Sequence, residues 1–254
     1  MRRVIKIGGR AQVDPSLPTR IARVWNDARG KLVVLHGGGD EISELQRRLG
    51  SDASFIGGRR VTTRTDIDLV RMVLSGVANK RLVSALVAAN VPAVGISGED
   101  GGLISAVQFD VELGKVGKPV SVNPVLLEVL LGAGFLPVVS PVSSATSNAD
   151  GGALNVNGDD AAAAIALALQ AEELVLVVDV EGVLDRKGKV VDILEKADAS
   201  DLVSDGIVNQ GMLAKLEAGF AALAGGVVKV RIAGLTGLDD RNAGTTLTLT
   251  PSLT

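Results

Sequence analysis

The chain has 254 residues, a formal net charge of −3, 46% hydrophobic residues and only 2% aromatic residues. This length suits one large α/β domain or two lobes, and the weak charge and scarce aromatic rings argue against a binder of nucleic acid or of membrane surfaces. The chain has no cysteine, which excludes disulfides and favours a cytoplasmic protein, and its single histidine, His36, argues against a zinc site.

The first predicted strand, Val4–Ile7, contains a lysine. Lys6 interrupts an apolar run, and Gly8 and Gly9 follow directly. Because a strand covered on both faces is normally apolar throughout, Lys6 is either a strand-end side chain that reaches solvent or a point charge in a phosphate site. Taken alone, this stretch favours the strand end, with the glycines serving a tight turn.

A helix is predicted around Leu17–Ala28, and the second strand, Leu32–Leu35, ends in a glycine loop. His36 and three glycines lead into a helix over Glu41–Leu49. Exposed N–H groups of small residues beside a helix N-terminus form an anion-binding geometry. The spacing differs from dinucleotide and Walker loops, and the chain lacks the G-x-S-x-G elbow of lipase-like hydrolases. The sequence therefore predicts that Gly38 and Gly39 lie at an anion site.

Between residues 57 and 140, helices and strands alternate around one predicted hairpin. Arg60 follows Gly57-Gly58 and is either a carboxylate ligand or, as the sequence favours, an exposed surface arginine. A helix cap at Thr65-Asp66 opens a helix over Asp66–Val77, and a further helix reaches Ala89. The other predicted elements are a turn at Gly98–Gly102, a hairpin over Val107–Val122 that could serve as a lid, a helix over Val125–Leu131, and strands at Ala93–Ile96 and Phe135–Ser140.

Polar residues alternate just before the Ala-rich helix Ala161–Leu169. In an extended segment, Asn155, Asn157 and Asp159 would project to one side and converge. The plainer interpretation makes Asp159 or Asp160 the helix N-cap, which leaves the asparagines unexplained.

The last third begins with a buried strand, Leu174–Val178, followed by Asp-x-x-Gly at positions 179–182. Loops at the carboxyl edge of a parallel sheet bind ligands in α/β proteins. A later helix carries Lys215, and strands are predicted at Val227–Ile232 and Thr246–Leu249. The alternation of strands and helices predicts a three-layer αβα sandwich with a mostly parallel central sheet, divided near Ala171 into lobes 1–171 and 172–254.

These motifs, taken together and in order, resemble those of the amino acid kinase family over essentially the whole chain. Each motif is weak alone, but seven in register are specific. They are Lys6-Ile7-Gly8-Gly9, His36-Gly37-Gly38-Gly39, Gly58-x-Arg60-Val61-Thr62, Ala78-Asn79-Lys80, Leu154-Asn155-Val156-Asn157-Gly158-Asp159, Asp179-Val180-x-Gly182-Val183-Leu184 and Gly211-Met212-x-x-Lys215.

The resemblance implies a carbamate kinase-like fold and phosphorylation of the γ-carboxylate of N-acetyl-L-glutamate by ATP, in arginine biosynthesis. It implies that Lys6 and Lys215 lie on the transferring phosphoryl group and that Asp159 holds both lysines. It places Arg60 and Asn155 on the acetylated amino acid. Backbone groups of Gly8, Gly9 and Gly38 would bind the phosphoryl group, with Gly38 and Gly39 also at the acceptor. The implied nucleotide-binding residues are Asp179, Val180, Gly182, Val183, Leu184, Ile207, Val208, Asn209, Gly211 and Met212.

The resemblance also implies Mg²⁺ carried by ATP without direct protein ligands. Lobe 1–171 would bind the amino acid and dimerise, and lobe 172–254 would bind ATP. Because the first strand begins at Val4 and leaves no room for an N-terminal helix, we expect a homodimer insensitive to arginine. Two alternatives remain open: a kinase of acetylated or carrier-protein-linked aminoadipate in lysine biosynthesis, and a regulatory binding protein that has lost catalysis.

Overall fold

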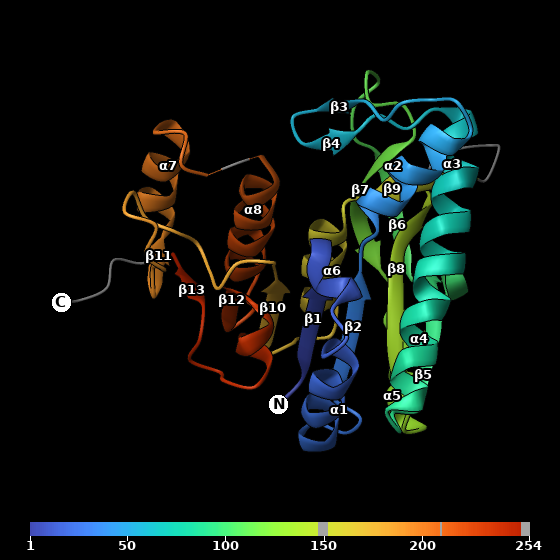
Figure 1. Ribbon diagram of the computed structural model, residues 1–254. Helices are drawn as coiled ribbons and strands as arrows, with labels where there is room; N and C mark the ends of the chain where they lie inside the picture. The colour runs from blue at the N-terminus through green and yellow to red at the C-terminus, as the bar shows by residue number, and fades with distance from the viewer. Residues whose placement is uncertain (147–151, 209, 250–254) are drawn as a thin grey trace.

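A single eleven-stranded sheet organises the chain in the computed structural model, which describes residues 1–146, 152–208 and 210–249 (Figure 1). Its strands are β1 (Arg3–Ile7), β2 (Leu32–His36), β5 (Ala93–Gly98), β6 (Ile104–Gln108), β7 (Val116–Val122), β8 (Leu136–Ala145), β9 (Ala153–Val156), β10 (Glu173–Val177), β11 (Ile193–Glu195), β12 (Lys229–Ala233) and β13 (Thr245–Thr248). Their order is β11-β13-β12-β10-β1-β2-β8-β6-β7-β9, with β5 paired to β8. The first strand of the chain, β1, therefore lies near the centre of the sheet.

The helices connect these strands. They are α1 (Leu17–Asp27), α2 (Gly39–Arg48), α3 (Arg64–Arg71), the π-helix η2 (Met72–Ala78), α4 (Asn79–Ala88), α5 (Val125–Gly132), α6 (Gly158–Ala168), α7 (Lys196–Ser204) and α8 (Gln210–Ala224), with short 3₁₀ turns η1 (Gly9–Val13), η3 (Asp100–Gly102) and η4 (Leu235–Leu238). A separate two-stranded hairpin consists of β3 (Phe55–Ile56) and β4 (Arg59–Arg60). No helix within the described ranges has both the length and the apolar character needed to cross a bilayer.

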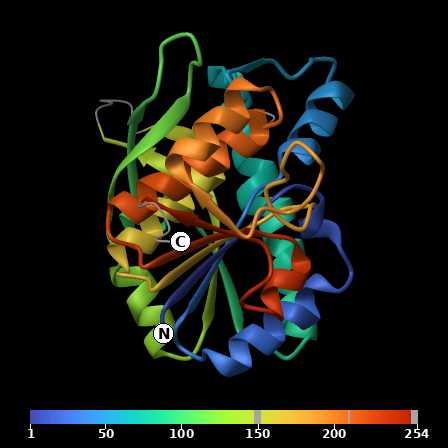
Figure 2. The ribbon, with the colours of Figure 1, turned by 90° about the vertical axis from the view of Figure 1, so that its left-hand side faces the viewer.

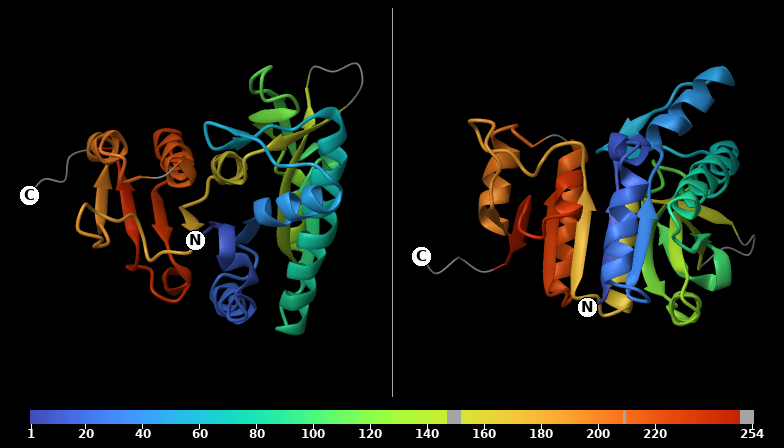
Figure 3. Two further views of the ribbon diagram at one scale, coloured as in Figure 1. Left: turned by 45° about the horizontal axis from the view of Figure 1, so that its top comes forward. Right: turned by 60° about the horizontal axis from the view of Figure 1, so that its bottom comes forward.

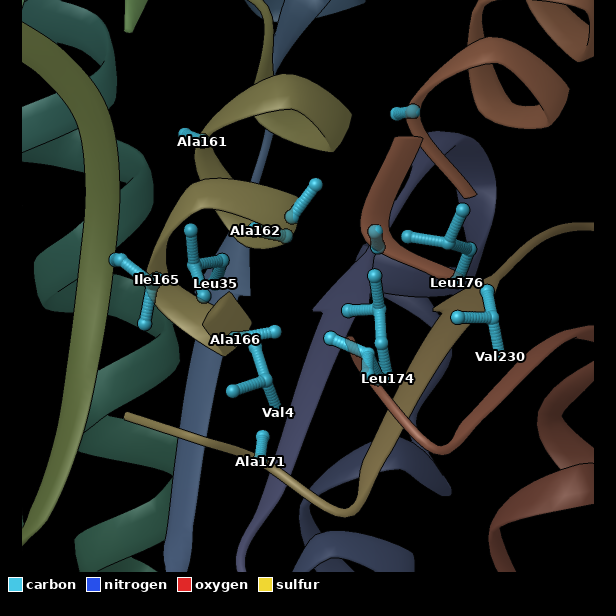
Figure 4. Close-up of a cluster of buried hydrophobic side chains, with 14 of the residues drawn as sticks. Val4, Leu35, Ala161, Ala162, Ile165, Ala166, Ala171, Leu174, Leu176 and Val230 are labelled. Atoms are coloured by element: carbon cyan, nitrogen blue, oxygen red, sulfur yellow. The ribbon is translucent and has the colours of Figure 1, made fainter. Parts of the chain in front are cut away.

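The two faces of the sheet bury different helices (Figure 2). Val4 and Leu35 pack with α5, α6 and α8 on one face, and Figure 4 shows both side chains beside Ile165 of α6. Ile5 and Val34 pack with α1 and α4 on the other face. This alternation follows from the two-residue period of a strand. Most strand pairs are parallel, so the predicted αβα sandwich with a mostly parallel sheet is confirmed.

The sheet continues across the predicted lobe boundary. Strand β1 pairs in parallel with β10, with Ile5 opposite Val175, and Figure 3 shows the two strands side by side. Strands from both predicted lobes are therefore hydrogen-bonded to each other within one sheet. The assignment of acceptor binding to one part and ATP to the other stays a prediction.

Several predicted elements differ in detail from the structure. The cap expected at Thr65-Asp66 is wrong: Thr63 caps α3, and Asp66 completes a reciprocal capping box because its carboxylate accepts the Thr63 N–H. The two predicted helices that follow form one continuous segment, α3–η2–α4, with π-helical turns at its middle. Strand β8 extends past Ser140 to Ala145, and β3, β4, β11 and α7 were not predicted. The hairpin predicted over Val107–Val122 is antiparallel β6–β7.

Candidate active site

Lys6 faces helix α6 because of its place on strand β1. It lies two residues after Val4, on the same face of the sheet. Its Nζ atom lies 2.9 Å from Oδ1 of Asp159, in the first turn of α6, and only 8% of its side chain is exposed. The strand-end interpretation, in which Lys6 reaches solvent, is therefore wrong.

Lys215 of α8 joins the same carboxylate from the other side. Its Nζ atom lies 3.2 Å from Oδ2 of Asp159. One carboxylate thus holds two ammonium groups that come from distant parts of the chain. The site carries a net positive charge that a phosphoryl group can neutralise.

Burial and charge oppose each other at this carboxylate. Burial raises the pKa of Asp159, but the charges of Lys6 and Lys215 outweigh burial and hold this pKa below its usual value of 3.8. Burial lowers the pKa of Lys6 below its usual 10.5; Asp159 opposes that change, and the nearby Lys215 adds to it. Asp159 is therefore ionised, and its negative charge offsets the charges of the two neighbouring ammonium groups.

The orientation of Asp159 depends on the start of α6. Asn157 is the N-cap, and its side-chain oxygen accepts from the N–H groups of Asp159 at 2.8 Å and of Asp160 at 3.4 Å. The alternative that made one of the aspartates the cap is wrong. The extended segment expected through Asp159 ends at Asn157, where the helix begins, so Asp159 projects from a helical turn.

Small residues leave room for the lysines. A Cβ atom on Gly8 would lie 3.1 Å from Nζ of Lys6 and 3.0 Å from the carbonyl oxygen of Val177. A Cβ atom on Gly158 would lie 3.0 Å from Cε of Lys6. The N–H of Gly8 donates to the Val177 carbonyl at 3.0 Å, and the phosphoryl-binding roles of Gly8 and Gly9 stay predictions. Gly9 adopts φ of +51° and has open space around its Cα.

A cavity of about 270 Å³ is lined by Gly158, the residue whose added Cβ atom would lie 3.0 Å from Cε of Lys6. The glycine loop after β2, hairpin β3–β4 and the β9–α6 junction form its walls. The predicted residues that line it are Gly38, Gly39, Arg60 and Asn155, joined by Phe55, Arg59, Asn157 and Gly158. This volume lies just below the ~300–1,000 Å³ typical of pockets for drug-sized ligands, so a small acceptor suits it.

Arg60 is buried, and the exposed position that the sequence favoured is wrong. Its guanidinium donates to Oε1 of Gln46 at 2.6 Å, to Oγ of Ser43 at 2.6 Å and to the carbonyl of Gly39 at 2.7 Å. These bonds use three of its five donors and fix the plane of the group. Burial lowers its pKa, although Asp66 and Asp40 oppose the change.

Asn155 is linked to Arg60 through Thr62. The amide of Asn155 donates to Oγ1 of Thr62 at 2.9 Å, and that hydroxyl donates to the carbonyl of Arg60 at 3.1 Å. The tip of hairpin β6–β7 closes on the same wall, since the N–H of Lys115 donates to the Thr62 carbonyl at 2.6 Å. The lid role of this hairpin stays a prediction.

The predicted nucleotide segments belong to the last third of the chain. Residues 179–184 follow β10 at the carboxyl edge, and residues 210–212 begin helix α8, which carries Lys215. Val183 belongs to the main hydrophobic core, and Val208 and Met212 pack against that core. Gly182 has no room for a side chain, because a Cβ atom would lie 2.7 Å from Val190. Asn209 lies outside the described residues, and the nucleotide-binding roles stay predictions.

Several supporting residues were missed by sequence reasoning. Asn157 orients Asp159, Ser43 and Gln46 hold Arg60, and Arg59 of β4 pairs with Asp160 of α6 at 2.8 Å. Only the Asn157 cap had a usable signal, an asparagine placed directly before an Ala-rich helix. The other contacts join segments whose distance depends on the fold.

Comparison with known proteins identifies the family. The profile described as the amino acid kinase family matches residues 1–234, and the chain belongs to this family. An acetylglutamate kinase of Cereibacter sphaeroides is 44% identical over 232 residues, covering 90% of this chain and 78% of that protein. An acetylglutamate kinase of Roseiflexus sp. is 42% identical over 247 residues, covering 96% and 92% of the two chains. Family and relatives together make the protein a kinase, which uses ATP.

Solved structures share the fold. A protein from Streptococcus mutans UA159 is 30% identical with a TM-score of 0.87, and the match covers 98% of each chain. Carbamate kinase from Giardia lamblia is 16% identical with a TM-score of 0.72, again over 98% of each chain, and supports the fold alone. The expected carbamate kinase-like fold is confirmed.

Proposed function

We propose that the protein is an acetylglutamate kinase, which transfers the terminal phosphoryl group of ATP to the γ-carboxylate of N-acetyl-L-glutamate. The relatives that cover most of its length carry this name. The product is an acyl phosphate, N-acetyl-L-glutamyl 5-phosphate, used in arginine biosynthesis. The observation that supports the proposal most directly is the pair of ammonium groups on Asp159, in the first turn of α6, whose first residue Gly158 lines the proposed acceptor cavity.

The acceptor is already ionised, so the reaction needs no general base. The barrier arises from repulsion between a carboxylate and ATP and from charge that spreads over the transferring phosphoryl oxygens. Lys6 and Lys215 offset that charge from two sides, in a site where low solvent exposure strengthens their effect. Asp159 keeps both lysines in place and takes no part in proton transfer.

The acceptor cavity suits a small dicarboxylate derivative. In the proposed complex, Arg60 binds the α-carboxylate with donors that Gln46, Ser43 and Gly39 do not use. The amide of Asn155 holds the acetylated amino group. Gly38 and Gly39 border both the acceptor and the phosphoryl group, which leaves the γ-carboxylate facing Lys6.

Mg²⁺ is proposed to reach the site on the phosphate oxygens of ATP, where it would neutralise part of their charge. At the proposed phosphoryl position the two lysines do not ligate a metal ion and both carboxylate oxygens of Asp159 are paired with them. Within the described ranges no group of three His, Asp or Glu residues could hold a metal ion. The proposed nucleotide-binding residues are Asp179, Val180, Gly182, Val183, Leu184, Ile207, Val208, Asn209, Gly211 and Met212.

A cytoplasmic homodimer is the proposed form of the enzyme. The side chains of Met72 and Val77 on η2 are 59% and 60% exposed. Residues five apart lie on one face of a π-helix, so the two offer an apolar surface for a second copy. Light scattering tests this proposal, and a monomeric mass would contradict it.

An ADP-release assay with a panel of acceptors tests the proposed activity. N-acetyl-L-glutamate is the expected acceptor, and N-acetyl-L-aminoadipate, carrier-linked aminoadipate and L-glutamate serve as comparisons. Turnover with an aminoadipate acceptor and none with N-acetyl-L-glutamate would reassign the substrate. No ADP release with any acceptor, from a folded protein that binds ATP, would favour a regulatory binding protein.

A further inference from the structure

The single histidine of the chain is buried and has no part in the proposed chemistry. His36 ends strand β2 directly before the glycine loop, and none of its surface is exposed. Its Nδ1 atom lies 2.9 Å from the carbonyl oxygen of Gly37. Its Nε2 atom lies 3.0 Å from the amide nitrogen of Asn79, the first residue of α4. The ring therefore connects the glycine loop to a helix behind it.

The partners of Asn79 determine which ring nitrogen carries the proton. The amide nitrogen of Asn79 also donates to the carbonyl of Val138 at 2.9 Å, and its oxygen accepts from Nζ of Lys80 at 3.1 Å. Asn79 is thus oriented to donate toward His36. Because Nε2 must accept that bond, the proton of the neutral ring lies on Nδ1 and is donated to Gly37.

The helix around Asn79 also supports the loop directly. The π-helical turns of η2 end at Ala78, directly before Asn79, and Leu74 and Ala78 lie against the loop. A Cβ atom on Gly38 would lie 2.8 Å from Cδ2 of Leu74 and 3.7 Å from Cβ of Ala78. Gly38 has φ of 159°, and its neighbour Gly39 begins helix α2. The loop thus lies against η2 and is joined to α4 through one imidazole ring.

We infer that Asn79 is a positioning residue for the glycine loop: it fixes His36 in the Nδ1–H form, and that ring holds the Gly37 carbonyl so that the N–H groups of Gly38 and Gly39 face the reacting groups. This inference rests on the proposed function for the identity of those groups. The contact between His36 and Asn79 stands independently of the substrate.

The surroundings of His36 support a neutral ring. The pKa of His36 is lowered to about 4, mainly by burial; the Gly37 carbonyl and Glu41 oppose this change, and Lys6 and Arg81 add to it. Lys80, which donates to Asn79, is also held by the carbonyl of Gly95 at 2.8 Å. A ring that stays neutral near pH 7 suits a fixed hydrogen-bond donor better than a proton shuttle.

Nitrogen-15 NMR of the imidazole tests the tautomer, because a chain with one histidine gives one pair of ring signals. The full-length wild-type protein is expected to show a protonated Nδ1 and an unprotonated Nε2 from pH 8 to pH 6. A dominant Nε2–H form would overturn the inference. The same spectra of Asn79→Ala are expected to show loss of the single tautomer.

Kinetics then separate positioning from simple stabilisation. Asn79→Ala is expected to lower kcat by up to about 10²-fold, the cost of small misplacements around a reacting centre. The matched control is Ser75→Ala, on the same helix, which removes a hydrogen bond to Ser140 that does not involve the loop. This control is expected to keep kcat. Equal kcat values for Asn79→Ala and wild type would contradict the inference.

Asn79→Asp keeps the size of the side chain and guards against a variant that does not fold. The introduced carboxylate accepts where the amide donates, so it raises the pKa of His36 and draws the proton of the neutral ring to Nε2. Below that new pKa the charged ring still donates to Gly37, and above it the donor is lost. We expect kcat/KM of this variant to fall as pH rises through the new pKa, while wild type stays flat there. If kcat/KM depends on pH in the same way for Asn79→Asp and wild type, the inference is contradicted.

Failure of the proposed function is distinguishable from failure of this inference. If wild type shows the Nδ1–H ring but no turnover with N-acetyl-L-glutamate, only the substrate assignment fails. Titration with a non-hydrolysable ATP analogue then replaces kinetics. The inference predicts weaker binding to Asn79→Ala than to Ser75→Ala, and equal binding would overturn it.

Discussion

Asp159 of helix α6 binds Lys6 of strand β1 at 2.9 Å and, with its other oxygen, Lys215 of helix α8 at 3.2 Å. One buried carboxylate thus connects strand β1 to helix α8. It also places two cations where the proposed reaction develops negative charge.

Removal of either cation is expected to slow phosphoryl transfer. Lys6→Ala and Lys215→Ala should each lower kcat by about 10²–10³-fold, the usual loss for one group that stabilises a transition state. The KM for N-acetyl-L-glutamate should change less, since Arg60 holds that substrate. Lys187→Ala, at an exposed turn, is the matched control. Full activity of both variants would contradict the assignment.

Asp159→Asn tests the role of the shared carboxylate in stability. The change leaves two buried ammonium groups without a counter-charge, and loss of one partner of a buried ion pair costs about 3–5 kcal/mol. Denaturant unfolding at pH 7 measures this loss. The wild-type advantage should be complete above pH 3.8 and disappear as pH falls through the lowered pKa of Asp159. A variant as stable as wild type at pH 7 would argue against two charged lysines.

His36 should make stability depend on pH in a separate window. The unfolded chain binds a proton at His36 below about pH 6.5, whereas the folded ring resists protonation down to about pH 4. The free energy of unfolding should therefore decrease by about 3 kcal/mol as pH falls from 6.5 to 4, at ~1.36 kcal/mol per pKa unit. His36→Asn, whose amide can still donate to Gly37, should remove this dependence. If the free energy of unfolding of His36→Asn falls with pH as steeply as that of wild type, the claim that His36 is buried and neutral is contradicted.

Gly8→Ala tests the close approach of backbone and lysine. The added methyl group would lie 3.1 Å from Nζ of Lys6, at a position whose φ of −113° suits alanine. We therefore expect kcat to fall by about 10-fold or more, because the Lys6 ammonium group and the Val177 carbonyl oxygen at 3.0 Å must shift to make room. Gly132→Ala, where a Cβ atom meets open space, is the control. Wild-type kcat in Gly8→Ala would show that Lys6 tolerates displacement.

Arg60→Lys tests acceptor recognition. A lysine keeps the charge but loses the planar fork that Gln46, Ser43 and Gly39 hold. We expect the KM for N-acetyl-L-glutamate to rise by about 10–100-fold, the value of one or two charge-assisted hydrogen bonds. The KM for ATP should stay near its wild-type value. A change confined to the KM for ATP would show that Arg60 acts on ATP and not on the acceptor.

Sequence patterns predicted the sheet well because buried strands are apolar runs bounded by glycine. Lys6 was predicted at a strand end by this pattern, and its two partners were predicted from family resemblance alone. Lys6, Asp159 and Lys215 are adjacent only because β1 pairs with β10 and α6 packs beside α8. No local signal encodes that adjacency.

The errors have physical causes of the same kind. Arg60 was expected at the surface because an isolated arginine is usually exposed, and its burial depends on Gln46 and Ser43 of helix α2. The π-helical turns of η2 were missed because their composition fits an α-helix. The role of Asn79 was not visible in the sequence, since its partner His36 lies 43 residues earlier, on strand β2.

Acyl phosphate formation tests the central claim most directly. ATP and N-acetyl-L-glutamate are incubated with enzyme and hydroxylamine, which converts an acyl phosphate to a hydroxamate that can be counted against ADP. We predict one hydroxamate per ADP for wild type and a loss of about 10²-fold or more for Lys6→Ala and Lys215→Ala. ADP without hydroxamate, or undiminished hydroxamate in both lysine variants, would contradict phosphoryl transfer to a carboxylate by this site.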